Sequence, residues 1–357
     1  MAAKRVGIIG VGFGSQVHLP AFQSEGWEIA GICSRNADKA RKASDAAGGV
    51  DVFTDPLELI ARKDVDAVAI STPPSSHHPL TMAALAAGKH VVCEKPFAMN
   101  AREAAEMRDA AASRGLTAMI AHEFRYTPQR GYIKQLVVEG YIGRFNLCTL
   151  ELFLDRYVTD KPRAASWQAF HEHGGGILGA LGSHYVDGLR DWFGEVSSVH
   201  CRLATLRPDV THESGKVVQA ESDDTYLLTL EFAKGGLATM IASFAGTPAR
   251  GARIVVMGDD GTLIAEQAGP NPTDDGVVVA SRKGSALAAL PTPAHHALEK
   301  DARDHRLMAF RMLVRDFTAG IEKGTSPSPN FVDGWRCQQV LDAARLSSDT
   351  GSTIAIA

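Results

Sequence analysis

Short apolar runs alternate with longer amphipathic stretches over the first third of the chain. Runs such as Arg5–Gly10 and Ala67–Thr72 have the length and aliphatic composition of buried strands. The stretches between such runs, for example Ala101–Arg114, are rich in alanine and charged residues and suit helices. Strands that alternate with helices form right-handed βαβ units, so we expect an α/β domain with a doubly wound parallel sheet over residues 1–124.

Apolar and polar positions alternate with a period of two in the second half of the chain, which is typical of half-buried strands. Hairpin turns are expected at Lys234–Gly236 and Asp259–Gly261, between neighbouring runs. This pattern predicts an α+β domain over residues 125–357, with a mostly antiparallel open sheet covered by helices on one face. The expected strands are Asn146–Leu154, Val196–Leu206, Asp224–Phe232, Leu237–Phe244, Arg253–Met257 and Thr262–Glu266, and the expected final helices are Arg306–Lys323 and Asp333–Ser348.

The composition is that of a globular chain of two domains. The 357 residues are 45% hydrophobic and 22% charged, with a formal net charge of −4. This balance provides no basic surface for nucleic acid or for an anionic membrane, and no apolar run approaches the roughly 20 residues that span a bilayer. The five cysteines are scattered and form no C-x-x-C pair, so we expect reduced thiols in a cytoplasmic protein.

A glycine-rich turn follows the first strand, with Gly10, Gly12 and Gly14 just before a helical pattern begins. Such a turn binds a pyrophosphate in Rossmann domains, because glycine permits the tight turn and a close backbone approach, and the helix N-terminus offers N–H groups. Ser15 stands at the third fingerprint position, usually Gly or Ala, and is small enough for contact between helix and strand. We therefore expect these residues and Phe13 to bind a dinucleotide; the alternative is a glycine-rich loop after a buried strand.

The end of the second strand bears on which dinucleotide binds. An NAD site usually has Asp or Glu here to accept a hydrogen bond from the ribose 2′-hydroxyl. This chain has Ser34 and Arg35, with Lys39 one helical turn further on. A hydroxyl and two cations suit a 2′-phosphate, so we expect NADP(H) in preference to NAD(H). The alternative is a solvated basic turn.

Two further strand ends carry candidate residues, since ligands of open α/β sheets bind beyond the carboxyl ends of the strands. Lys95 follows a buried strand and is flanked by Glu94 and Pro96, which makes it a candidate acid, base or substrate-orienting group. The alternative is a lysine that faces solvent. The expected cofactor-binding residues at these two ends are Ser71, Thr72, Pro73, His77, Glu94, Lys95 and Pro96.

A second candidate stretch lies in the second domain, where Gly174–Gly176 open a helix that carries His184 and Asp187. The imidazole of His184 could exchange a proton with a substrate hydroxyl, and Asp187 could orient it. The alternatives are a core histidine or a metal site. The potential ligands are His171, Glu172, His173 and His184, but this spacing is a weak signal, and we expect no metal.

Together these segments resemble the glucose–fructose oxidoreductase, inositol dehydrogenase and MocA (Gfo/Idh/MocA) family of nicotinamide-dependent oxidoreductases. The resemblance covers essentially the whole chain. It implies that Lys95 takes part in catalysis, that Pro96 contacts the nicotinamide side, that His184 is an acid/base candidate, and that the end of strand two resembles NADP-preferring members. It also adds Arg125 to the cofactor-binding residues. The segments that carry the resemblance are Gly10–Gly14, Ser71–His77, Glu94–Pro96, Phe124–Pro128, Gly174–His184 and Phe331–Ser348.

One position departs from the family pattern. Many members have an Asp four residues before the helix histidine, and this chain has Ala180 there. Either His184 works with Lys95 alone, or Glu172 or Asp187 substitutes for the missing carboxylate. We expect Trp167 to line the substrate pocket together with Lys95 and His184.

The sequence thus predicts an NADP-preferring oxidoreductase that moves a hydride between nicotinamide and a carbon of a sugar, polyol or related carbonyl compound. Two alternatives use the same scaffold: a non-catalytic nucleotide-sensing regulator, which Ala180 favours, and a glycoside-cleaving enzyme that recycles bound NAD. We expect a homodimer or homotetramer formed through the second-domain sheet.

Overall fold

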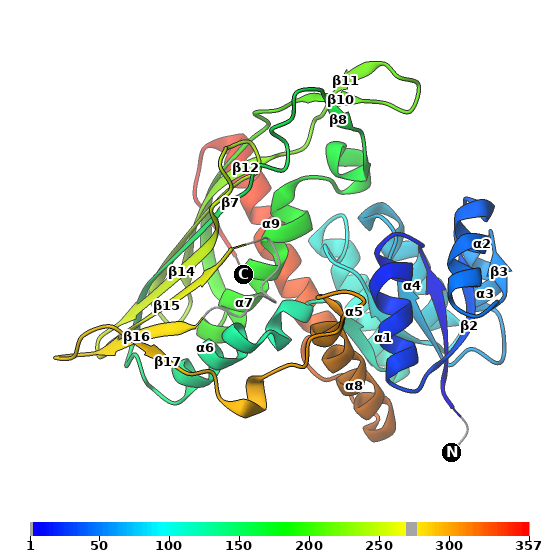
Figure 1. The fold of residues 1–357 in the computed structure, drawn as a ribbon, viewed down its shortest axis with the longest axis horizontal. Helices are drawn as coiled ribbons and strands as arrows, with labels where there is room; N and C mark the ends of the chain where they lie inside the picture. Colours follow the sequence, from blue (N-terminus) through cyan, green and yellow to red (C-terminus); the bar gives the residue numbers. More distant parts are fainter. Residues whose placement is uncertain (1–2, 269–276, 357) are drawn as a thin grey trace. The chain divides into compact units, whose positions relative to one another are not determined.

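The computed structural model describes residues 3–268 and 277–356, and the chain divides into two compact units (Figure 1). The first unit consists of Met1–Glu123 and Glu299–Gln338, and the second of Phe124–Leu298 and Gln339–Ala357. The long helix α9 (Phe331–Thr350) contains the point at which the chain passes from the first unit to the second.

A six-stranded sheet, in the described part of the first unit, has the order β3-β2-β1-β4-β5-β6 with all neighbours parallel. The chain adds strands on one side of β1 and then returns to add the rest on the other side, which confirms the doubly wound parallel sheet. The strands are β1 (Arg5–Ile9), β2 (Glu28–Cys33), β3 (Val52–Phe53), β4 (Ala67–Ile70), β5 (His90–Cys93) and β6 (Ala118–Ile120).

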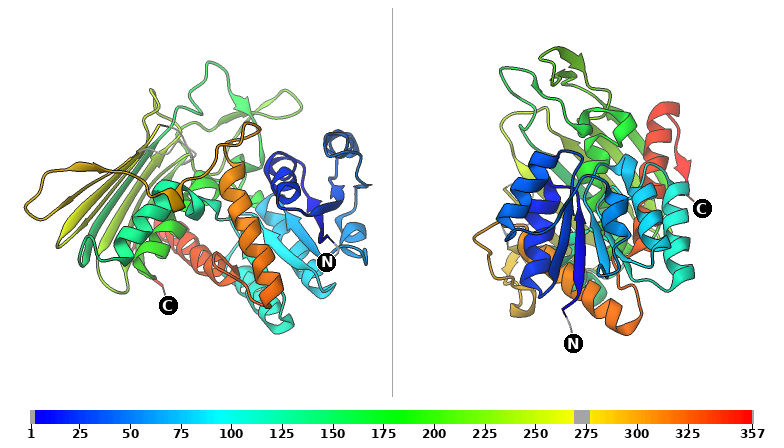
Figure 2. Two further views of the ribbon diagram at one scale, coloured as in Figure 1. Left: turned by 60° about the horizontal axis from the view of Figure 1, so that its bottom comes forward. Right: turned by 90° about the vertical axis from the view of Figure 1, so that its right-hand side faces the viewer.

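Helices cover both faces of this sheet (Figure 2), so its central strands are buried on both sides. Helices α3, α4 and α5 pack on one another and bury a core that includes Ile70, Leu85 and Met107. The helices before residue 124 are a π-helical turn (Gly14–His18), α1 (Leu19–Ser24), α2 (Ala37–Ala46), α3 (Pro56–Ile60), a 3₁₀ turn (Pro74–Ser76), α4 (His77–Ala86) and α5 (Ala101–Arg114), with a further 3₁₀ turn from Glu123.

Helix α8 (Leu307–Lys323) also belongs to the first unit, although the sequence analysis assigns it to the second domain. It packs against α1, where the ring of Phe22 meets that of Phe317 edge to face at 6.3 Å, and against Trp27, which follows α1. The rings of Trp27 and Phe317 stack at 5.9 Å, and the indole N–H of Trp27 donates to the Thr318 hydroxyl at 2.9 Å. An apolar helix late in the sequence thus completes the core of the N-terminal sheet.

The second unit contains, in its described part, a nine-stranded sheet of order β17-β16-β15-β14-β7-β13-β12-β9-β18. All neighbours are antiparallel except β7 and β13, and the two expected hairpins join β12 to β13 and β14 to β15. The mostly antiparallel sheet is therefore confirmed. Its strands are β7 (Phe145–Phe153), β9 (Val196–Ala204), β12 (Thr225–Phe232), β13 (Leu237–Ser243), β14 (Gly251–Gly258), β15 (Gly261–Gln267), β16 (Val278–Arg282), β17 (Ala288–Leu290) and β18 (Ile354–Ala355).

One face of this sheet is covered by α6 (Pro128–Val138) and α7 (Ser183–Phe193), as Figure 1 shows. Residues of β12 alternate accordingly: Leu228 and Leu230 are buried, whereas Leu227 on the opposite face is 49% exposed. At the end of α7, the ring of Phe193 stacks on Phe145 of β7 at 3.7 Å.

A separate three-stranded sheet is formed by the short strands β8 (Arg163–Ala164), β10 (Asp209–Thr211) and β11 (Val217–Gln219). The sequence analysis does not predict it, because strands of two or three residues are too short to show a period. Within the described residues, none of the helices combines the length and the apolar character needed to cross a membrane.

Candidate functional site

In the first unit, the last residues of strands β2, β1, β4, β5 and β6 are paired with one another across the sheet. The residues paired across it are Cys33, Ile9, Ile70, Cys93 and Ile120. The ladder continues by one residue, since the backbone N–H groups of Gly10, Ser71 and Glu94 donate to Cys33, Ile9 and Ile70 at 2.8–2.9 Å. The expected cofactor-binding segments of this unit therefore begin side by side at one edge of the sheet.

The glycine turn has the shape that a bound phosphate requires. Gly10 has a φ of +109°, and a Cβ there would lie 2.3 Å from the carbonyl oxygen of Ser71. A Cβ on Gly12 would meet no atom within 4 Å, so the backbone there is open to a ligand. The buried hydroxyl of Ser71 has no hydrogen-bond partner among the described residues, which leaves a donor for a phosphate or ribose oxygen.

The sequence analysis expects Ser15 to allow close contact between helix and strand, but in the structure Gly14 makes this contact. A Cβ on Gly14 would lie 3.2 Å from Ile8 and from Ser71, whereas the Ser15 hydroxyl donates to the carbonyl of Val11 at 2.5 Å. The π-helical turn that begins at Gly14 thus leaves the fingerprint serine to satisfy the backbone of the loop.

Glu94 and the buried His18 form a contact that the sequence analysis misses. The imidazole Nε2 of His18 lies 2.8 Å from Glu94 Oε1, and the backbone N–H of Lys95 donates to Glu94 Oε2 at 3.2 Å. Burial raises the pKa of Glu94, but the hydrogen bond to His18 and the charge of Lys95 outweigh it and hold that pKa below its usual value. Glu94 is thus an ionised group that fixes the backbone at Lys95.

His77 ties together the two loops that carry Thr72 and Pro96. Its Nε2 lies 2.8 Å from the carbonyl oxygen of Thr72, and its Nδ1 lies 3.0 Å from that of Pro96. The side chain is fully buried, and burial lowers its pKa, so the neutral imidazole is favoured. Pro73 and Thr72 lie in the first of these loops, where the Ser76 hydroxyl donates to that of Thr72 at 2.7 Å.

The end of β2 presents exposed cations at the start of α2. Asn36 caps this helix, because its side chain accepts a hydrogen bond from the backbone N–H of Lys39 at 2.9 Å, and its own N–H donates to the Ser34 hydroxyl at 3.2 Å. Arg35 and Lys39 are both exposed. A helix N-terminus with two solvent-accessible cations favours an anion.

Glu123 is a buried acid at the same edge, and the sequence analysis does not single it out. It follows β6, is 4% exposed, and burial together with the charge of Glu94 raises its pKa to about 8, against the lowering effect of Lys95 and Arg306. Two carboxyl groups at one buried edge thus favour opposite protonation states, Glu94 ionised and Glu123 neutral.

Asp223 packs against the glycine segment of the second unit, Gly174–Gly176, and accepts a hydrogen bond from the residues that follow it. A Cβ on Gly176, where φ is +103°, would lie 2.0 Å from Asp223 Oδ1, and the backbone N–H of Leu178 donates to Oδ2 at 2.8 Å. Asp223 therefore caps the π-helical turn (Leu178–Gly182) that leads into α7. Burial raises its pKa to about 6.

His184 lies near the start of α7 and is 2% exposed. Its ring stacks on Phe124 at 3.8 Å with an interplanar angle of 8°. Phe124 comes from the segment that also carries Arg125, so Arg125 and His184 are brought close to one another. Trp167 is half-buried in a short 3₁₀ turn (Trp167–Ala169).

Arg125 and Asp187 form a buried ion pair. The guanidinium Nε and Nη2 donate to the two oxygens of Asp187, both at 2.6 Å, and Nη1 donates to Asp191 at 3.1 Å. The Arg125 and Asp187 side chains are 8% and 1% exposed. The Asp187 carboxylate is thus committed to a bidentate pair, and the other candidate substitute, Glu172, is 75% exposed.

The sequence analysis left a metal site in the histidine-rich stretch as an alternative. In residues 3–268 and 277–356, no three His, Cys, Asp or Glu side chains are grouped so that they could hold an ion.

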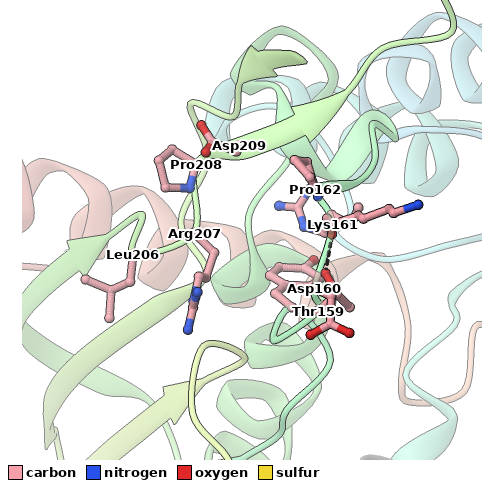
Figure 3. Close-up of a pocket in the computed structure, with 10 residues that line it drawn as sticks. Thr159, Asp160, Lys161, Pro162, Leu206, Arg207, Pro208 and Asp209 are labelled. Carbon is pink, nitrogen blue, oxygen red and sulfur yellow. Dashed lines mark hydrogen bonds between the residues drawn. The ribbon is translucent and has the colours of Figure 1, made fainter. Parts of the chain in front are cut away.

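The structure contains a cavity of about 290 Å³ beside the small three-stranded sheet (Figure 3). It is lined by Tyr157, Thr159–Arg163 and Leu206–Asp209, and none of the expected site residues borders it.

The parallel sheet and the glycine loop at its carboxyl edge define a domain of the dinucleotide-binding Rossmann class. The chain belongs to the Gfo/Idh/MocA family. Residues 4–122 match the family's N-terminal domain, described as an oxidoreductase family with an NAD-binding Rossmann fold, and residues 134–356 match its C-terminal alpha/beta domain. This confirms the resemblance seen in the sequence, and the chain is an NAD(P)-dependent dehydrogenase.

Levoglucosan dehydrogenase of Pseudarthrobacter phenanthrenivorans is 27% identical over 96% of this chain and 95% of its own length. The scyllo-inositol 2-dehydrogenase (NADP(+)) of Bacillus subtilis is 30% identical over 76% of this chain and 74% of its own. A solved structure of a levoglucosan dehydrogenase in complex with NADH is 24% identical, covers 99% of each chain and has a TM-score of 0.88, which shows the same fold.

We predict that Glu123→Gln alters how stability depends on pH. A raised pKa in the folded state means that the acid contributes stability that is fully present below its ordinary pKa of 4.5 and lost as the pH rises through about 8. Relative to wild type, the Gln variant should therefore gain roughly 5 °C in melting temperature between about pH 5 and about pH 9.

The measurement is thermal unfolding of both proteins over that pH range, with the exposed Glu213→Gln as the matched control. A constant difference between wild type and Glu123→Gln at every pH would show that Glu123 is ionised throughout.

Proposed function

We propose that this protein is an NADP-preferring dehydrogenase that transfers a hydride between the nicotinamide and a carbon of a sugar, polyol or related carbonyl compound. The observation that carries the cofactor preference is the end of β2, where Ser34 and the exposed Arg35 replace the expected acid. The relatives named for levoglucosan and for scyllo-inositol support a polyhydroxylated substrate, and the latter is named for NADP(+).

The 2′-phosphate would bind at the start of α2. The Arg35 guanidinium provides a planar fork for phosphate oxygens, Lys39 adds a second positive charge, and Ser34 provides a hydroxyl. The helix N-terminus contributes its dipole in the same direction. The pyrophosphate would lie over the glycine turn, where the backbone at Gly12 is open.

The chemistry is divided between cofactor and protein. When bound, the nicotinamide carries the hydride. We assign the proton on the reacting oxygen to the ε-amino group of Lys95 and to the imidazole of His184, and the binding of the substrate to these two and to Trp167. Two contacts support these assignments. The hydrogen bond to Glu94 fixes the backbone from which the Lys95 side chain extends, and the stacking on Phe124 fixes the ring of His184.

The outer face of the second-unit sheet supports a homo-oligomer. A row of small or β-branched residues crosses five adjacent strands on this face, and each is only partly buried. The row is Thr229, Thr239, Thr149, Val255 and Ile264. A row of uncharged, partly buried side chains suits contact with a second copy of the chain, so we propose a dimer or tetramer formed through this face.

The state of the cysteines supports a reducing compartment such as the cytoplasm. All five, Cys33, Cys93, Cys148, Cys201 and Cys337, are buried and free.

Cofactor preference is tested with Arg35→Ala. Loss of the guanidinium should raise the Kd for NADPH about 10- to 100-fold and leave that for NADH within about twofold, since only NADPH has the 2′-phosphate. Titration with each cofactor, followed by tryptophan quenching, measures both constants. The control is Arg41→Ala, in the helix α2 that follows Arg35, where Arg41 pairs with Asp38. Tighter NADH binding by wild type, or indifference to Arg35, would overturn the NADP preference.

Catalysis is tested with Lys95→Met and His184→Gln. Each should lower kcat for a sugar or polyol substrate about 10²- to 10⁴-fold, the usual effect of removing a general acid or base, while NADPH still binds. A panel of such substrates with NADP gives the wild-type reference. Wild-type protein that binds NADPH and turns over no member of the panel would favour the regulator alternative.

Assembly is tested with Val255→Lys and Ile264→Lys. A buried, unpaired charge at a subunit interface is costly, so each variant should sediment as a monomer where wild type sediments as a dimer or tetramer. Leu57→Lys, at a residue that is 54% exposed on the first unit, is the control and should leave the assembly intact. Monomeric wild type at micromolar concentration would exclude the oligomer.

A further inference from the structure

Arg306 lies beside the glycine turn, although the two are almost 300 residues apart in the sequence. The centre of its guanidinium lies 5.0 Å from the ring centroid of Phe13, and its Nη2 lies 3.4 Å from Gln16 Oε1. Both partners belong to the segment from Gly12 to His18 that forms the expected phosphate site. The packing of α8 in the first unit thus brings a cation to the loop.

The position of this guanidinium is fixed by its own chain segment. Nε and Nη2 of Arg306 donate to the two oxygens of Asp304, at 2.9 and 2.6 Å, and the backbone N–H of Arg306 donates to the same carboxylate at 2.9 Å. Phe310, one turn into α8, packs against His18 at 4.2 Å. The Arg306 side chain itself is held by Asp304 on one side and by Phe13 and Gln16 on the other, so it loses little freedom when a ligand binds.

Arg306 nevertheless remains accessible. Its side chain is 26% exposed, and Gln16, which it contacts, is exposed as well. A guanidinium that is both fixed and accessible can offer N–H groups to an anion in a defined direction.

The charges at this edge of the sheet create a need for such a cation. No Lys or Arg occurs between Gly10 and Leu19, so the glycine turn itself carries no permanent positive charge. The ionised carboxylate of Glu94 lies at the same edge, and its charge acts on Arg306. The ionised Glu94 would repel a pyrophosphate brought to this loop; Lys95 offsets part of that charge, and Arg306 provides a further cation beside the glycine turn.

We propose that Arg306 is a cofactor-binding residue whose guanidinium contacts the pyrophosphate of the dinucleotide over the glycine turn. This inference rests on the dinucleotide site of the proposed function but not on its preference for NADP, because NADPH and NADH contain the same pyrophosphate. The role differs from that of Arg35, which faces only the 2′-phosphate.

Arg306→Met removes the charge and keeps the aliphatic stem that packs near Phe13. We expect the Kd values for NADPH and for NADH to rise by the same factor, tenfold or more. Tryptophan quenching measures both with purified full-length protein. Arg303→Met is the matched control, since Arg303 lies in the same segment, pairs with Asp301 and is 53% exposed; its Kd values should stay within about twofold of wild type.

Two fragments of the cofactor separate the phosphate subsites. ADP contains the pyrophosphate, and adenosine 2′-monophosphate contains only the 2′-phosphate. Arg306→Met should weaken ADP at least tenfold and leave adenosine 2′-monophosphate unchanged, whereas Arg35→Ala should do the reverse. Arg306→Lys, which keeps the charge, should recover part of the ADP affinity.

The inference is overturned if Arg306→Met binds NADPH, NADH and ADP within about twofold of wild type. It is also overturned if all ligands, including adenosine 2′-monophosphate, weaken together with a fall in melting temperature, because Arg306 would then act only on the fold. Failure of the NADP preference would appear separately, as an Arg35→Ala variant that binds NADPH normally.

Discussion

The common level of the strand ends in the parallel sheet is the constraint on which the rest of the first unit depends. Ile9, Ile70 and Cys93 are paired across adjacent strands, and the next residue of each strand continues the ladder by a backbone hydrogen bond. The first residue of each loop is therefore fixed to within one hydrogen bond. Three segments therefore begin at the same edge of the sheet: the glycine turn, the loop that starts at Ser71 and the segment Glu94–Pro96. The hydrogen-bond ladder fixes their starting positions.

Burial at that edge makes charge the next constraint. Glu94 stays ionised because His18 and Lys95 surround it, and Glu123 favours the neutral form because the same low-dielectric edge already contains one carboxylate. A nicotinamide dinucleotide brings further negative charge. The glycine turn has no Lys or Arg of its own, and the guanidinium of Arg306, just before α8, lies beside it.

Buried charged groups in the second unit are likewise paired or hydrogen-bonded. Arg125 is neutralised by Asp187 and Asp191, and Asp223 closes the turn that leads into α7. Asp187 and Asp191 therefore fix the segment of Phe124, and Asp223 fixes the turn before the helix that carries His184. Ala180 stands at the family's usual Asp position, and the buried Asp223, which caps the turn before α7, has a pKa raised to about 6.

The sequence by itself determined the central strands of both sheets and the glycine turn, because period, apolar run length and turn residues are local signals. It did not predict β3, β16, β17 and β18, which lie toward the edges of the two sheets. It also determined the family, since several weak motifs occur together in the right order. Only the tertiary structure decided that α8 completes the first unit, that Asp187 pairs with Arg125, and that Glu123 and Arg306 lie at the cofactor edge. These are contacts between residues distant in sequence, and burial sets their charge states, so no local pattern encodes them.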